Sequence, residues 1–175
     1  MLAELLAKRT QNAPARYPLS FNQKSMWYLY RFAPDSPAYN ARLTADVGSA
    51  VDVELLKQAC DYLVRRHEIL RTVYGFQGAE SLQEVLPEMP VDFAQLAAAG
   101  LSDEKLTLRI DEESNRHFDL ERGPILRVRL FTRSTSDHRL LLVIHHIAID
   151  FWSFMILADS LCDVYAALLR SETPE

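Results

Sequence analysis

Two strand-like segments that lie close together in the chain, residues 125–131 and 139–145, constrain the fold most. The first alternates apolar residues with arginines, which predicts one face toward the core and one toward solvent. The expected core residues are Leu126, Val128 and Leu130, and the expected solvent residues are Arg127 and Arg129. The second segment is nearly all apolar, which is typical of a central strand covered on both faces. We therefore expect an α/β fold in which helices cover a mixed sheet.

Helix and hairpin signals in the rest of the chain agree with this class. A capping box formed by Ser20 and Gln23 begins a helix that ends before Pro34. Asp52 and Ser102 can begin two further helices, the second reaching about His117. Strands are expected at 40–47 and in a hairpin of 70–76 with 81–86. The last helix should run from about Phe151 to Arg170, with a buried stripe of Phe151, Phe154, Met155, Ala158, Leu161, Cys162, Tyr165 and Leu168.

Charge and apolar patterning exclude several classes of partner and location. The net charge of −5 gives no electrostatic surface for nucleic acid. The unbroken apolar runs are far shorter than a bilayer span, and the first residues lack the apolar core of a secretion signal. Cys60 and Cys162 lack CxxC spacing and are expected to be buried, reduced thiols. We expect a cytoplasmic domain at 15–175, preceded at 1–14 by a short helical stretch and a linker or N-terminal extension.

The strongest chemical signal is the pair His145 and His146 at the end of the apolar strand. Side chains alternate along a strand, so one imidazole should face a cleft while its neighbour is held in the interior. The same geometry disfavours chelation of one metal ion by both, and no third ligand stands at helical spacing, so we expect no metal site. A histidine can act as a base at neutral pH, but periodicity alone favours a satisfied core histidine.

Asp150 has two interpretations. It directly precedes the apolar stripe of the last helix and can serve as its N-cap, which the spacing favours. Alternatively, it can pair with a buried arginine and hold the loop in shape. Arg66 and Arg71 are the candidate partners within the chain.

Three ordered motifs resemble the signatures of condensation domains of nonribosomal peptide synthetases. The first motif, Tyr17 to Leu29, matches at Ser20, Gln23 and Trp27. The second is the run Arg66-His67-Glu68-Ile69-Leu70-Arg71-Thr72. The third, His145-His146-Ile147-Ala148-Ile149-Asp150, is similar to the HHxxxD active-site motif. The spacing of Phe118-Asp119-Leu120 and Gly123-Pro124 also agrees.

The resemblance implies a fold like chloramphenicol acetyltransferase, in which two similar lobes enclose a tunnel. Donor and acceptor carrier proteins would deliver thioesters on phosphopantetheine arms, so the chain itself would bind no cofactor. His146 would act on the attacking amine as a base or as an orienting group, and a backbone N–H near the start of the last helix would stabilise the oxyanion. His145 and Asp150 would support the site, and Arg66, His67, Glu68 and Arg71 would be architectural. For Asp150 the resemblance favours a charge partner, in this chain or in the other lobe, over a pure cap.

Two departures from the family pattern matter. Phe151 stands where the pattern has glycine after the aspartate, which changes the bulk beside the site. The family's later signatures are absent, so the chain resembles an amino-terminal lobe without its carboxyl-terminal lobe, and this fragment alone should be inactive. Two alternatives stay open: a non-catalytic domain of the same fold that recruits partners, and an ester-forming acyltransferase of the superfamily.

Overall fold

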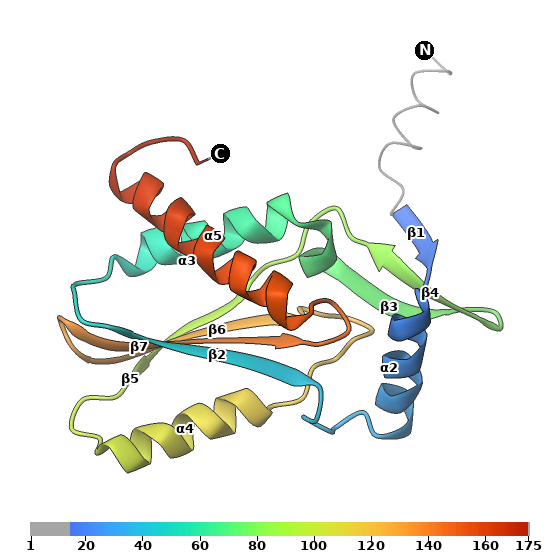
Figure 1. Cartoon of the computed structure of the whole chain (residues 1–175), viewed down its shortest axis with the longest axis horizontal. Coiled ribbons are helices and arrows are strands. Elements are labelled where there is room, and N and C mark those ends of the chain that lie inside the picture. Colours follow the sequence, from blue (N-terminus) through green and yellow to red (C-terminus); the bar gives the residue numbers. More distant parts are fainter. Residues whose placement is uncertain (1–14, 175) are drawn as a thin grey trace.

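The computed structural model describes residues 15–174 and folds them into two sheets with flanking helices (Figure 1). The predicted helical stretch within 1–14 lies outside these residues. The elements follow in the order β1 (Ala15–Pro18), α2 (Phe21–Phe32), β2 (Asn40–Val47), α3 (Val53–Arg66), the 3₁₀ helix η1 (Glu68–Arg71), β3 (Thr72–Gln77), β4 (Glu80–Val85), β5 (Asp92–Ala97), α4 (Asp103–Asn115), β6 (Leu126–Ser134), β7 (Asp137–His145) and α5 (Phe151–Leu169).

The main sheet has four strands in the order β2-β7-β6-β5. Strand β7 is antiparallel to both β2 and β6, whereas β5 runs parallel to β6, so the sheet is mixed as predicted. The central position of β7 explains its nearly continuous apolar sequence, because both of its faces are covered. Strand β5 was not predicted: its sequence, DFAQLA, is short and carries only a weak alternating pattern.

Helices cover both faces of the main sheet. Figure 1 shows α3 and α5 together on one face and α4 on the other. The α3–α5 face packs on Leu126, Val128 and Leu130 of β6, which confirms the predicted core side of that strand. The opposite face packs Phe131, Leu141 and Val143 against α4 and the fully buried Trp27 of α2.

A second, three-stranded antiparallel sheet has the order β1-β4-β3. The predicted hairpin is therefore present as β3 and β4, but it pairs with β1 rather than joining the main sheet. Trp27 connects α2 to this sheet by an edge contact with Phe76, at 5.7 Å between ring centroids.

The predicted helix caps are confirmed. Ser20 and Gln23 form both hydrogen bonds of a capping box before α2. Asp52 accepts from the Leu55 N–H before α3, and Ser102 accepts from the Lys105 N–H before α4. These contacts are local in sequence, and they set where three of the helices begin.

Arg127 and Arg129 correct the prediction for the outer face of β6. Both side chains lie on the face opposite Leu126, as predicted, but each residue is only 3% exposed. Asp92 of β5 pairs with both guanidinium groups, at 3.1 Å from Arg127 Nε and 2.7 Å from Arg129 Nη2. Glu113 of α4 pairs with Arg129 at 2.7 Å. Helix α4 thus covers a face that the alternation alone assigned to solvent.

The predicted stripe of α5 is also corrected in part. The buried residues of this helix are Phe154, Leu157, Leu161 and Val164. Phe151 and Cys162 are exposed, whereas Cys60 is buried as expected. By length and composition alone α5 could cross a membrane, but it packs on α3 and contributes to the core of this domain.

Candidate active site

His145 is the last residue of β7, and His146 begins the short loop that leads to α5. His145 is buried and His146 is exposed, which confirms that the two side chains face opposite ways. The loop is held at its start by the backbone, because the His146 N–H donates to the Tyr39 carbonyl at 2.8 Å. One imidazole is therefore part of the interior and the other is accessible.

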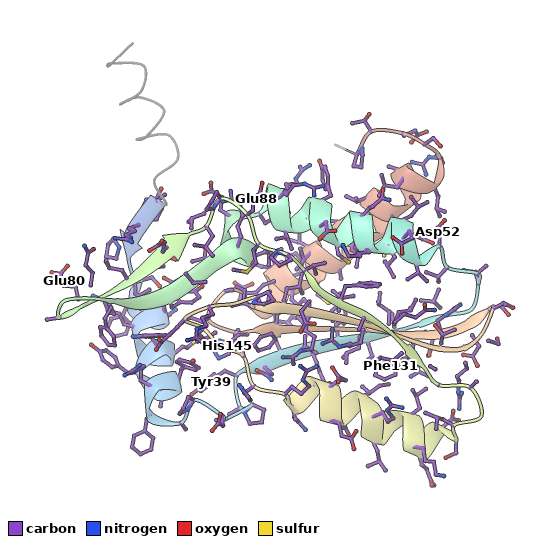
Figure 2. All side chains as sticks on the ribbon, turned by 180° about the vertical axis from the view of Figure 1, so that it is seen from behind. Tyr39, Asp52, Glu80, Glu88, Phe131 and His145 are labelled. Atoms are coloured by element: carbon purple, nitrogen blue, oxygen red, sulfur yellow. The ribbon has the colours of Figure 1, made fainter. Side chains whose placement is uncertain are left out.

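Three contacts fix the buried His145 ring. Its Nδ1 accepts a hydrogen bond from the Ile147 N–H at 3.1 Å. The ring lies 6.2 Å from that of Tyr39 and meets the Phe118 ring in a T-shaped contact at 6.3 Å between centroids. Figure 2 shows His145 and Tyr39 together, away from Phe131 along the sheet. Burial, and then the neighbouring His146, lower the pKa of His145 to about 4, so this ring is neutral near pH 7.

The Nδ1 atom of His146 is hydrogen-bonded to the Ile149 carbonyl oxygen. Since a carbonyl oxygen only accepts, Nδ1 must carry the proton and donate it. In the neutral ring this leaves the lone pair on Nε2. His146 is thus an accessible imidazole with its tautomer set by its own loop, and that is the form that can accept a proton or a hydrogen bond.

Asp150 is the N-cap of α5, as the spacing predicted. Its carboxylate accepts from the Ser153 N–H at 2.7 Å, and this hydrogen bond is the main cause that lowers the pKa of the exposed carboxyl group. The two arginines proposed as partners within the chain bond elsewhere: Arg66 donates to the Tyr62 hydroxyl and Arg71 to the Leu86 carbonyl. Neither candidate pair is formed, so among residues 15–174 Asp150 has the cap contact and not the charge partner that the resemblance favoured.

Two large apolar side chains stand beside the histidine loop on the first turn of α5. Phe151 is 75% exposed and Trp152 is 73% exposed. Phe151, which occupies the position of the pattern's glycine, therefore points away from the core of this domain. Together they make the accessible surface next to His146 and Asp150 strongly apolar.

The second motif lies against the same loop. His67, the C-cap of α3, lines a cavity of about 280 Å³ with Ile149 and Ser153. Burial, and then the nearby Arg66, lower the pKa of His67. Glu68 is exposed and forms an ion pair of 3.3 Å with Arg71. The Arg71 contact with Leu86 ties η1 to the segment after β4, which supports an architectural role.

The first motif forms the start and the buried side of α2. Ser20 caps α2, and Gln23 also donates to the Gln83 side chain of β4 at 3.2 Å. Trp27 stacks on Tyr30 at 5.3 Å between ring centroids. These contacts join α2 to the small sheet, and Trp27 belongs to the same buried cluster as Ile147 of the histidine loop.

Sequence reasoning missed three residues around the site: Tyr39, Asn40 and Phe118. Asn40 is opposite His145 in the β2–β7 register, and its amide donates to the carbonyls of Ser114 and Arg116 at the end of α4. Phe118 belongs to a run whose spacing agrees with the family pattern. The sequence did not link any of the three residues to His145, because they come from separate parts of the chain. Among residues 15–174 there is no group of three or more His, Cys, Asp or Glu side chains placed to hold a metal ion.

Comparison with known proteins assigns the family. The family described as Condensation domain matches residues 14–175. A linear gramicidin synthase from Brevibacillus parabrevis is 37% identical over 90% of this chain, and the match covers 2% of that synthase. The dimodular nonribosomal peptide synthase of Bacillus subtilis is 34% identical over 93% of this chain and is covered over 7% of its length. The chain belongs to the condensation-domain family.

Solved structures of low sequence identity share the fold. The first condensation domain of the CDA synthetase aligns with a TM-score of 0.84 at 21% identity, over 94% of this chain and 42% of that one. The X-domain in complex with OxyB from teicoplanin biosynthesis aligns with a TM-score of 0.83 at 29% identity, over 93% of this chain and 35% of that one. The chain therefore spans about two fifths or less of these solved chains.

Proposed function

We propose that residues 15–175 form the amino-terminal lobe of a cytoplasmic condensation domain that makes an amide bond in nonribosomal peptide synthesis. The observation that carries this proposal is the geometry of His146. Its ring is exposed, and its Nδ1 is bonded to the Ile149 carbonyl, which leaves Nε2 available. The donor acyl or peptidyl thioester and the acceptor amine would arrive on the phosphopantetheine arms of two carrier proteins, with no cofactor bound by the chain itself.

The proposed step is acyl transfer from sulfur to nitrogen. The acceptor amine attacks the thioester carbonyl, the C–N bond forms, and the C–S bond breaks after a tetrahedral intermediate. His146 Nε2 accepts the proton that the amine loses or holds that amine in line, and the proton finally reaches the departing thiolate. An exposed imidazole fits either task, because both need a lone pair directed out of the protein.

His145 and Asp150 support this geometry without entering the reaction. His145 is neutral, buried and occupied at Nδ1 by the Ile147 N–H, so it is poorly placed to exchange protons. The Asp150 carboxylate accepts a hydrogen bond from the Ser153 N–H. That leaves the amides of Phe151 and Trp152, in the first turn of α5, as candidate oxyanion donors with the helix dipole behind them.

Exposed apolar surface supports a second lobe as the partner of this one. Phe151 and Trp152 beside the histidines are mostly exposed. On α2 the same holds for Phe21 and Phe32, which are 85% and 91% exposed. Large exposed apolar side chains in groups are typical of surfaces that another protein segment covers.

A partner-recruiting domain is the alternative that one observation favours. The X-domain shares this fold and was solved in complex with OxyB. A domain of this fold can therefore bind another protein. The accessible His146 ring, whose tautomer is set by the Ile149 carbonyl, favours an acyltransferase.

The test is amide formation by the complete condensation domain that contains this chain, in its synthetase. Donor and acceptor carriers loaded with their own thioesters are mixed with the domain, and mass spectrometry of the acceptor carrier follows a single turnover. We expect His146→Ala to lower the rate by about 10²–10⁴-fold, the usual contribution of a positioned acid–base group. His117→Ala, which removes another exposed imidazole, is the matched control and should change the rate less than about twofold.

The outcomes separate the alternatives. Normal amide formation by His146→Ala would show that the domain is not catalytic through this residue and would favour recruitment. A wild-type domain that yields an oxygen ester rather than an amide would assign it to the ester-forming branch.

A further inference from the structure

Phe118 lies between a buried arginine and the buried histidine of the site. The Arg127 guanidinium carbon is 4.5 Å from the centroid of the Phe118 ring. The same Phe118 ring makes the T-shaped contact with His145 at 6.3 Å between centroids. All three side chains are almost fully buried, at 3–4% exposed. Phe118 thus contacts both residues at the end of the β6–β7 pair where the histidine loop begins.

Four hydrogen bonds hold the Arg127 guanidinium in one plane. Nε donates to Asp92 at 3.1 Å. The two Nη atoms donate to three carbonyls at the carboxyl end of α4: Glu113 at 3.0 Å, Arg116 at 3.1 Å and His117 at 3.1 Å. A planar guanidinium with four of its five N–H groups engaged cannot rotate freely. The face that it presents to Phe118 is therefore fixed.

A hydrogen bond joins the His145 ring to the histidine loop. Its Nδ1 accepts from the Ile147 N–H, which lies in the middle of the turn between His146 and Ile149. If the ring tilted, this bond would lengthen and the turn would lose one of its ties. The Ile149 carbonyl, which sets the His146 tautomer, is two residues further along.

We propose that Arg127 and Phe118 are positioning residues that orient the His145 ring and, through it, the loop that carries His146. The role in catalysis rests on the proposed function, whereas the orientation of the loop does not. An apolar residue at 127 could fill the same volume, but it would lack the directional hold that a bonded guanidinium plane exerts on an aromatic face.

The neighbouring Arg129 is a buried arginine without an aromatic contact of this kind. It lies on the same face of β6, is equally buried, and bonds to Asp92 and Glu113. Its guanidinium contacts no aromatic ring among the cation–π pairs of residues 15–174. Arg129 therefore serves as a control for the loss of a buried charge. Phe131 serves as a control for the loss of a buried ring, because it packs in the same cluster as Phe118 but lies opposite Arg139, at the far end of β7.

The experiment measures amide hydrogen exchange at Ile147 in the chain 1–175, relative to the amides of β7. Phe118→Leu should speed Ile147 exchange by about two- to tenfold, the equilibrium change expected from loss of an edge-to-face contact. Phe131→Leu should leave the ratio unchanged, because any general loss of stability affects Ile147 and β7 together. Arg127→Met should act like Phe118→Leu, and Arg129→Met like Phe131→Leu.

Steady-state kinetics of the complete domain give the second readout. Phe118→Leu should lower kcat by about two- to tenfold with KM unchanged, and Phe131→Leu should leave both unchanged. Equal effects of Phe118→Leu and Phe131→Leu on Ile147 exchange would overturn the positioning proposal. A wild-type domain that forms no amide would overturn the proposed function alone, since the exchange comparison needs no activity.

Discussion

The Nδ1 atom of His146 is hydrogen-bonded to the carbonyl oxygen of Ile149, three residues further along the chain. A loop of this length thus sets the protonation pattern of its own first side chain. Because the donor must be Nδ1–H, the neutral ring has its lone pair on Nε2, and the residue is exposed. The neighbouring His145 has the opposite arrangement, since its Nδ1 accepts from a backbone N–H. The two adjacent histidines are therefore opposite tautomers: Nδ1 donates in His146 and accepts in His145.

Removing each histidine should affect stability differently. His145→Ala leaves the Ile147 N–H without its acceptor and a gap beside Phe118, so we expect a loss of about 1–3 kcal/mol. His146→Ala removes an exposed ring and its hydrogen bond to the Ile149 carbonyl, and should cost about 1 kcal/mol or less. Urea denaturation of the chain 1–175 measures both. A larger loss for His146→Ala would contradict the assignment of the two faces.

His145 should make stability depend on pH below neutrality. Its pKa is about 4 in the folded chain and about 6.5 in the unfolded chain. Between these values the unfolded state binds a proton that the folded state does not, so stability is full above pH 6.5 and falls as the pH drops toward 4. The loss should reach about 3 kcal/mol. His145→Asn keeps an acceptor but does not titrate. Between pH 6.5 and pH 4 its free energy of unfolding should therefore fall by about 3 kcal/mol less than that of the wild type. If the unfolding free energies of the wild type and His145→Asn changed in parallel with pH, the buried, neutral state of His145 would be refuted.

Asp150 should behave as a helix cap in this chain. Asp150→Asn should change the free energy of unfolding by less than about 0.5 kcal/mol, because asparagine caps about as well, whereas Asp150→Ala should cost about 1 kcal/mol. The two variants are compared by urea denaturation. A loss of about 3–5 kcal/mol for Asp150→Asn in the complete domain, but not in 1–175, would reveal an arginine partner outside this chain.

The buried arginines should be far more costly to remove than exposed ones. Arg129→Met removes the buried cation that bonds to Asp92 and Glu113, which then keep only Arg127 and Arg116 as partners, and we expect a loss of about 3–5 kcal/mol. Arg42→Met breaks a half-exposed ion pair with Asp111 and should cost about 1 kcal/mol or less. Thermal or urea unfolding of the two variants gives the comparison. Similar small losses would mean that the β6 face is open to water after all.

The chain 1–175 alone should not catalyse condensation. The proposed tunnel needs a second lobe, so carrier proteins loaded with donor and acceptor should give no amide product with 1–175. Mass spectrometry of the acceptor carrier checks this. Turnover at a rate near that of the complete domain would refute the two-lobe interpretation.

Local and periodic features could be predicted from the sequence. The caps at Ser20, Asp52, Ser102 and Asp150 are made by side chains three residues from their partners, so short-range chemistry decides them. The apolar run before His145 predicted a central strand, and the alternation of side chains predicted that the two histidines face opposite ways. The three motifs placed the chain in its family before any contact was known.

Only the tertiary structure decided what covers each face. Alternation along β6 separated Arg127 and Arg129 from the core residues, but it could not show that α4 and Asp92 would close over them. It also could not show that Phe118 would lie between Arg127 and His145. Periodicity reports which side of a strand a residue occupies. Whether water, a helix or an ion pair meets that side depends on contacts between segments that are distant in sequence, and these form only when the chain has folded.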